Sequence, residues 1–177
     1  NSWQYTFMLA HDAKGLMKLM GGKEAYSKQL QKVFNIGQFD MANEPDIGYP
    51  YLFNYVAGQE WRTQKTVSEL ISTYFKNAPD GLPGNDDTGT MSAWLVFSMM
   101  GIYPISPATP TYTITTQVFD KITIKLDSRY YDQNHLVIEK EGKGVINQLK
   151  IGEEISKGFF INHSELVKSK YLKISLE

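Results

Sequence analysis

The sequence has 177 residues, 42% of them hydrophobic and 13% aromatic, which is the composition of a folded protein and not of a disordered one. Its 18 basic and 19 acidic residues give a net charge of -1, and no stripe of Lys and Arg marks a nucleic-acid partner. The longest apolar stretch, 91–102, is interrupted by Ser98 and Gly101 and is too short to insert into a membrane. The absence of cysteine excludes disulfides and thiolate metal sites and leaves the compartment open.

The first 106 residues have the periodicity of helices. Apolar side chains recur at i, i+3, i+4 and i+7, and glycines follow several of the segments. This pattern predicts five helices, over 13–20, 26–34, 49–56, 67–75 and 90–100. The fifth is apolar on nearly every side, so we expect it to be buried on most sides.

The pattern changes after Pro104. Pro104, Pro107 and Pro110 form a stiff connector, because proline fixes φ and lacks an N–H donor. Six segments then alternate or are rich in β-branched residues between turn residues, at 111–116, 121–126, 135–140, 146–151, 158–162 and 171–176. We therefore predict an α+β fold class, with a helical part over 1–106 and an antiparallel β region over 107–177.

Two loops place polar and acidic side chains directly before a helix. One carries Asn43, Glu44 and Asp46, and the other, PGNDDTG at 83–89, carries Asn85, Asp86 and Asp87. The unpaired N–H groups and the dipole of a helix N-terminus stabilise negative charge. A carboxylate held there stays ionised, as a general base or a metal ligand must be.

Simpler readings of these residues remain open. Asp, Asn and Thr are common helix caps, and by position Thr88 or Thr90 is the better cap, which leaves Asp86 and Asp87 without a capping role. The stretch NDDTG lacks the alternating acids and the distal Glu of an EF-hand calcium loop. The three histidines, His11, His135 and His163, have no metal-ligand spacing to one another.

Several stretches, in the same order, resemble the C-terminal part of glycoside hydrolase family 92. They are NSWQYTF, then HD, GLMKLMGGKE, NEPDIGYPYLFNYVAGQEWRTQ and DGLPGNDDTGTMSAWLVFSMMGIYPISP. The resemblance is dense over residues 1–125. It implies a bacterial, calcium-dependent exo-acting α-mannosidase with an inverting mechanism. It also implies that residues 1–106 are part of an (α/α)6 helical toroid, followed by strands.

The resemblance also implies roles for individual residues. Asp87 matches the general base, and Asn85 stands where the family can carry an assisting carboxylate. Glu44 matches a calcium-binding carboxylate, and Asn43 a neighbour of the substrate or the calcium. Trp3 and Gln4, with Tyr5, match the wall of the active site. Asp46, Ile47 and Gly48 depart from the commoner pattern, which leaves the preferred linkage open.

The general acid is expected outside this chain. In the family the first motif reads Glu-Gly-Asn-x-Trp-Gln-Tyr with the Glu as proton donor, and this sequence starts at the Asn of that motif, Asn1. We therefore expect a portion of a longer enzyme that is inactive by itself. A toroid cut in this way exposes an apolar face, through which we expect a homodimer.

The sequence therefore favours part of an inverting exo-α-mannosidase that hydrolyses α-1,2-linked mannosides with calcium. Two alternatives from other classes stay open. The first is a non-catalytic module in which the acids bind calcium or carbohydrate. The second is a helical scaffold in which the acids only cap helices.

Overall fold

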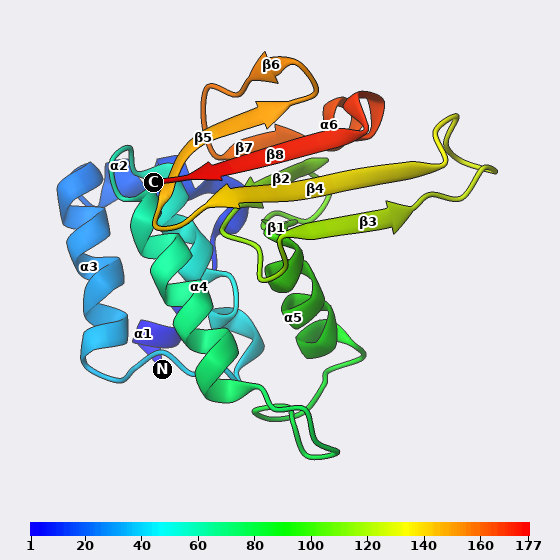
Figure 1. Cartoon of the computed structure of the whole chain (residues 1–177). Coiled ribbons are helices and arrows are strands. Elements are labelled where there is room, and N and C mark those ends of the chain that lie inside the picture. The colour runs from blue at the N-terminus through cyan, green and yellow to red at the C-terminus, as the bar shows by residue number, and fades with distance from the viewer. The chain divides into compact units, whose positions relative to one another are not determined.

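The computed structural model describes residues 1–177 and divides them into two compact units, drawn in Figure 1. Unit 1 comprises residues 1–96 and 105–107, and unit 2 comprises residues 97–104 and 108–177. Unit 1 is helical and unit 2 contains the strands, which confirms the α+β fold class. No helix is both long enough and apolar enough to span a membrane. A domain boundary at 106/107 stays a prediction.

Unit 1 is built from α-helices and short 3-10 helices. They are α1 (Ser2–Tyr5), η1 (Ala10–Asp12), α2 (Ala13–Leu19), α3 (Lys23–Asn35), η2 (Glu44–Asp46), η3 (Tyr49–Tyr55), α4 (Glu60–Tyr74) and the start of α5 (Thr90–Met100). The helices expected at 13–20, 26–34, 67–75 and 90–100 are confirmed. The one expected at 49–56 is a 3-10 helix, and Tyr49 to Asn54 are all buried, so the segment has no amphipathic stripe to distinguish the two helix types.

Aromatic side chains fill the core of unit 1. Phe7 packs edge-on against Tyr26, with ring centroids 5.3 Å apart. Trp94, which is 1% exposed, stacks on Phe75 at 5.5 Å and donates an indole hydrogen bond to the Ile47 carbonyl oxygen at 2.8 Å. An aromatic pair of this kind contributes about 0.5–1.5 kcal/mol beyond its buried area. Trp94 therefore ties α5 to the segment that follows η2.

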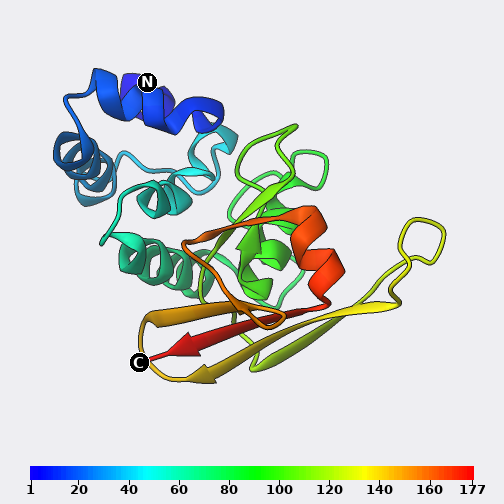
Figure 2. The same cartoon turned by 90° about the horizontal axis from the view of Figure 1, so that it is seen from above.

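Unit 2 contains two sheets, one complete helix and the end of α5. Its strands are β1 (Ile102–Tyr103), β2 (Thr111–Ile114), β3 (Lys121–Lys125), β4 (His135–Gly142), β5 (Ile146–Ile151), β6 (Glu154–Ile155), β7 (Phe160–Asn162) and β8 (Tyr171–Leu176), and its helix is α6 (His163–Ser169). The sheet orders are β1-β2-β7 and β3-β4-β8-β5-β6. The loop between β3 and β4 projects beyond the end of the larger sheet (Figure 2).

One strand pair differs from the antiparallel expectation. β8 pairs antiparallel with β5 but parallel with β4. The reason is topological: β8 is inserted between β4 and β5, which run in opposite directions, so it can be antiparallel to only one of them. The helix α6 was not predicted, because its seven residues lie between two strand patterns.

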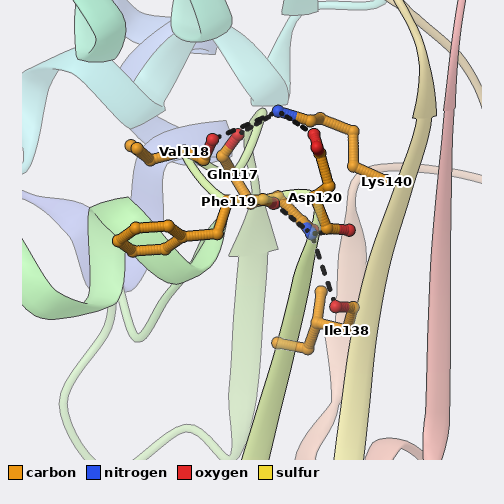
Figure 3. Close-up of polar contacts among 6 residues, drawn as sticks. All are labelled: Gln117, Val118, Phe119, Asp120, Ile138 and Lys140. Carbon is orange, nitrogen blue, oxygen red and sulfur yellow. Dashed lines mark hydrogen bonds and ion pairs between the residues drawn. The ribbon is translucent and has the colours of Figure 1, made fainter.

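A buried glutamine fixes the turn that leads into β3. Gln117 is 2% exposed, and its Nε2 donates to the carbonyl oxygens of Phe119 at 2.8 Å, Asp120 at 3.2 Å and Ile138 at 3.4 Å (Figure 3). Lys140 Nζ donates to the carbonyl oxygens of Gln117 at 3.3 Å and Val118 at 3.2 Å. These bonds join residues 117–120 to β4, beside a core of aliphatic side chains from both sheets.

Candidate active site

The loop at 83–89 has an unusual backbone. Asp87, Thr88 and Gly89 are consecutive left-handed residues, with φ of 49°, 60° and 91°. This conformation costs an L-residue roughly 1–2 kcal/mol, and Thr adds a β-branch that makes it rarer still. Such strain persists only where the surrounding structure enforces it, and it is concentrated at functional sites.

Asp86 caps the helix that follows this loop. Its Oδ1 accepts a hydrogen bond from the Ser92 amide at 2.9 Å, and its carbonyl oxygen accepts one from the Met91 amide at 3.1 Å. The expectation that Thr88 or Thr90 caps α5 is therefore wrong. The left-handed turn folds the chain back so that Asp86 reaches the first turn, and the Thr90 hydroxyl donates to the Asp87 carbonyl oxygen at 2.7 Å.

Asp87 and Asn85 differ from Asp86 in having free side chains. Both residues are exposed, and neither side chain forms a hydrogen bond or an ion pair within the chain. A general base must reach a water molecule and a substrate, which an internally bonded carboxylate does less well. The geometry thus gives the two neighbouring acids different surroundings, and the catalytic role of Asp87 stays a prediction.

The second loop places Asn43 and Glu44 at the start of η2. Glu44 is exposed and Asn43 is half-buried. Two residues on, Asp46 is fully buried and accepts a hydrogen bond from the Asp40 amide at 2.9 Å. Burial raises the pKa of Asp46 to about 6, against the lowering effect of the Asp40 amide and the Asn43 side chain.

The first motif forms the short helix α1. Asn1 Oδ1 accepts from the Gln4 amide at 3.2 Å and Gln4 Oε1 accepts from the Asn1 amino group at 3.1 Å, so Gln4 is engaged in a capping box. The Lys32 ammonium lies 5.1 Å from the centroid of the half-buried Trp3 ring. One face of Trp3 is therefore already covered by a cation.

The structure brings the three motifs together within unit 1. α1 packs against η2, and the Tyr49 hydroxyl, just after η2, accepts from the Phe7 amide at 3.0 Å and donates to the Trp3 carbonyl oxygen at 3.4 Å. Gly84 lies against Ala42, where a Cβ on Gly84 would be 2.8 Å from the Ala42 Cβ. Residues 1–5, 42–46 and 84–87 therefore form one continuous region, which we call the three-motif region.

The three-motif region fits calcium in ligand type but not in ligand number. Calcium takes six to eight oxygen ligands, and carboxylate and amide oxygens of the kind that Glu44 and Asn43 carry are suitable. However, no group of three or more His, Asp or Glu side chains that could hold a metal occurs in the chain. Calcium binding by Glu44 with Asn43 therefore stays a prediction.

Comparisons with known proteins identify the family of this chain. The family model for the glycosyl hydrolase family 92 catalytic domain matches residues 1–177. This chain therefore belongs to glycosyl hydrolase family 92, as the ordered motifs indicated.

Individual proteins similar to this chain are also glycosidases. An uncharacterized secreted glycosidase of the fungus Arthroderma benhamiae is 32% identical over 123 residues, which is 70% of this chain and 16% of that protein. Two mannosidase structures of Bacteroides thetaiotaomicron superpose closely on this chain. The family GH92 enzyme BT3965 has 27% identity and a TM-score of 0.84 over 98% of this chain and 24% of its own. The inverting mannosidase BT2199 has 27% identity and a TM-score of 0.85 over 100% of this chain and 27% of its own.

Two features of the region could not be predicted from the residue pattern. The burial of Asp46 has little local signal, because only Ile47 beside it is a buried apolar residue and Glu44, two positions earlier in the same motif, is exposed. The capping role of Asp86 depends on two left-handed non-glycine residues, which the sequence gives no reason to expect. The tandem Asp-Asp before an apolar helix was the available signal for this loop, and its role in a site stays a prediction.

Proposed function

We propose that this chain contributes the general-base side of the active site of an inverting exo-α-mannosidase. The observation that supports it most is the exposed, unbonded Asp87 carboxylate on a strained loop, in a chain that matches the family over its whole length. The chain spans 24–27% of the matched mannosidase structures, so the activity belongs to the longer enzyme.

In the proposed mechanism Asp87 takes a proton from the water that attacks the anomeric carbon. Inverting glycosidases keep their two carboxyl groups roughly 6.5–9.5 Å apart so that this water fits between base and sugar. The second carboxylic acid, which protonates the leaving oxygen, is proposed to come from the part of the enzyme that this chain does not span. Asn85 orients the water or the sugar by hydrogen bonds but cannot share the proton.

The substrate is proposed to be a terminal α-1,2-linked mannoside. In support, a family member was solved in complex with mannoimidazole, a fold match at 25% identity and a TM-score of 0.85. Trp3, Gln4 and Asn43 are the residues of this chain proposed to line the sugar subsite. Release of mannose from α-1,2-, α-1,3- and α-1,6-mannobiose by the full-length enzyme would rank the linkages.

Calcium is the proposed cofactor, with Glu44 as a direct ligand and further ligands from outside this chain. When bound, calcium would supply a positive charge that coordinates hydroxyl oxygens of the sugar. We expect EGTA to abolish activity and added calcium to restore it. Glu44→Gln should raise the calcium concentration needed for half-maximal activity by tenfold or more, without a matching loss of stability in calcium-free buffer.

The test of the base compares two neighbouring acids in the full-length enzyme. Asp87→Asn should lower kcat by roughly 10²–10⁴-fold, the usual cost of losing an acid or base. Asp86→Asn is the matched control and should keep near wild-type kcat, because Asn also caps helices. Near wild-type turnover in Asp87→Asn would show that the base is another residue.

The competing class is a non-catalytic module. Calorimetric titration of this chain with calcium and mannose addresses it, since micromolar binding by the isolated chain favours a module and no binding favours a divided site.

The chain alone is proposed to be inactive. The proposed homodimer rests on exposed apolar side chains such as Tyr5 at 58% and Met8 at 56%, and analytical ultracentrifugation of the isolated chain tests it.

A further inference from the structure

Unit 1 contains a cavity of about 740 Å³ that none of the predicted site residues lines. Its walls come from α3, from the segment after η3 and from the first turn of α4 (Figure 1). The lining residues that carry the argument are Lys23, Glu24, Lys28, Lys32, Gln59 and Arg62. Ligand pockets for small molecules have volumes of roughly 300–1,000 Å³, so the cavity is large enough for one.

The cavity gathers positive charge in a part of the chain that is acidic overall. Residues 1–96 contain eight Lys and Arg against ten Asp and Glu, yet four of the eight basic residues line this cavity with a single acid, Glu24. The ion pairs of the chain involve other cations, namely Lys65, Arg129, Lys140, Lys150 and Lys173. The four cavity cations therefore have no carboxylate partner within the chain.

Arg62 is held in a fixed orientation at the cavity wall. Its Nη1 donates to Gln31 Oε1 at 2.8 Å, and its guanidinium lies 5.8 Å from the Phe53 ring centroid and 5.3 Å from that of Trp61. Its Nε is buried and has no hydrogen-bond partner. A buried donor without a partner is rare, and an ion or ligand that the protein binds is one of its explanations.

Two further features of the wall indicate the chemistry of the ligand. Gln59 is the N-cap of the 15-residue helix α4, and its side chain makes no capping bond, so the positive end of the helix dipole lies at the cavity. The Gln59 Oε1 is a buried acceptor without a partner. The cations of the cavity can bind an oxyanion, and Gln59 Oε1 can accept a hydrogen bond from a hydroxyl group, so a ligand that carries both groups fits the wall.

We propose that this cavity is a second binding site, for an oxyanion that is free or carried by a sugar, such as a phosphorylated or carboxylated monosaccharide. Arg62 anchors the oxyanion, because a preorganised guanidinium matches phosphate and carboxylate geometry. Lys23 and Lys28 add charge at the rim, and Gln59 Oε1 accepts from a hydroxyl group. The site does not depend on the proposed mannosidase activity, and it takes its ligand outside the three-motif region.

The experiment is calorimetric titration of the full-length enzyme with inorganic phosphate, glucose 6-phosphate and glucose at low ionic strength. We expect the two phosphates to bind and glucose not to bind. Arg62→Gln should weaken phosphate binding at least tenfold and Lys28→Gln severalfold. Lys65→Gln is the matched control, because Lys65 lies on α4, outside the cavity and paired with Glu69 at 3.8 Å.

Each result has a definite meaning for the proposal. Tighter binding of glucose 6-phosphate than of phosphate identifies a sugar-borne anion, and equal binding identifies a free one. No phosphate binding, equal binding by wild type and Arg62→Gln, or glucose binding as tightly as its phosphate would overturn the proposal. If Arg62→Gln fails to fold, the exposed Lys28 provides the deciding variant. Mannoside hydrolysis, measured in parallel, should be unchanged in Lys28→Gln.

Discussion

Gly84 lies against Ala42 where two of the three motif loops meet. A Cβ on Gly84 would be 2.8 Å from the Ala42 Cβ, closer than real side chains approach. Gly84 belongs to the loop that carries Asp87, and Ala42 directly precedes Asn43 and Glu44. This contact joins the loop of the predicted base to the loop of the predicted calcium ligand.

Gly84→Ala should damage the enzyme through this contact. One loop has to move, and overpacking of this kind costs roughly 1–3 kcal/mol of folding free energy. Because the base shifts relative to the sugar subsite, we expect kcat/KM of the full-length enzyme to fall at least tenfold. Gly158→Ala is the control, since nothing lies within 4 Å of a Cβ there and its φ is outside the left-handed region. Equal behaviour of the two variants would mean that the loops are not held by the Gly84 contact.

The two acids at 86 and 87 should separate stability from activity. Asp86→Ala removes the cap of α5 and should lower the free energy of unfolding by about 1 kcal/mol. Asp87→Asn removes no internal bond and keeps a residue type that tolerates the left-handed φ of 49°, so it should change stability by less than about 0.5 kcal/mol while lowering turnover at least 100-fold. Urea denaturation followed by tryptophan fluorescence measures the stabilities, because Trp94 lies on α5. A larger loss of stability in Asp87→Asn than in Asp86→Ala would contradict the capping assignment.

The residue pattern predicted the architecture wherever local periodicity decides structure. The stripes that define α2, α3 and α4 and the alternation that defines β3 to β5 and β8 each follow from a few residues. η3 was misassigned because its side chains are buried on all sides, so its sequence carries no amphipathic signal. The parallel pairing of β8 with β4 depends on the insertion of β8 between β4 and β5. The local sequence of one strand does not indicate its place in the strand order.

The candidate site was predictable in its motifs but not in its internal division of roles. Nothing in the letters NDD says which of the two acids turns back to cap the helix, because that depends on the left-handed residues 87 and 88. The cavity at Arg62 was not predicted either. Its cations come from segments at least thirty residues apart in the sequence, Lys23 to Lys32 and Arg62, and only the packing of α3 beside α4 brings them together.

Asp46 should make stability depend on pH in the direction opposite to that of an ion-paired carboxylate. Burial raises its pKa from 3.8 to about 6, so between these values the folded chain holds a proton that the unfolded chain has released. The stabilisation is therefore complete below about pH 4 and is lost as the pH rises through 6.

Asp46→Asn tests this sign, because Asn keeps the shape and an acceptor for the Asp40 amide but does not titrate. In urea denaturation with EGTA, the free energy of unfolding of the variant, relative to that of the wild type, should increase by about 1–3 kcal/mol between pH 4 and pH 7. Above pH 7 the difference should be constant. Parallel curves for the two proteins would show that Asp46 is not the buried acid that the structure describes.

Gln117 should be the most sensitive polar position of unit 2. Its Nε2 donates to three carbonyl oxygens at the turn into β3, and its side chain is almost fully buried (Figure 3). Gln117→Glu keeps the size but replaces this donor by a carboxylate facing those carbonyl oxygens. We expect a loss of about 2–4 kcal/mol, more than for Gln117→Ala, because a buried charge without a partner costs more than a missing bond.

Asp120→Asn is the matched control for this prediction. Asp120 pairs with Lys140 at 3.4 Å from the same turn, but its side chain is 92% exposed, and exposed pairs contribute about 0–1 kcal/mol. Hydrogen exchange of the β4 amides measures the effect locally, because all three tryptophans lie in unit 1 and do not report on this sheet. Unchanged protection of β4 in Gln117→Glu would mean that the turn, and not the glutamine, carries the stability.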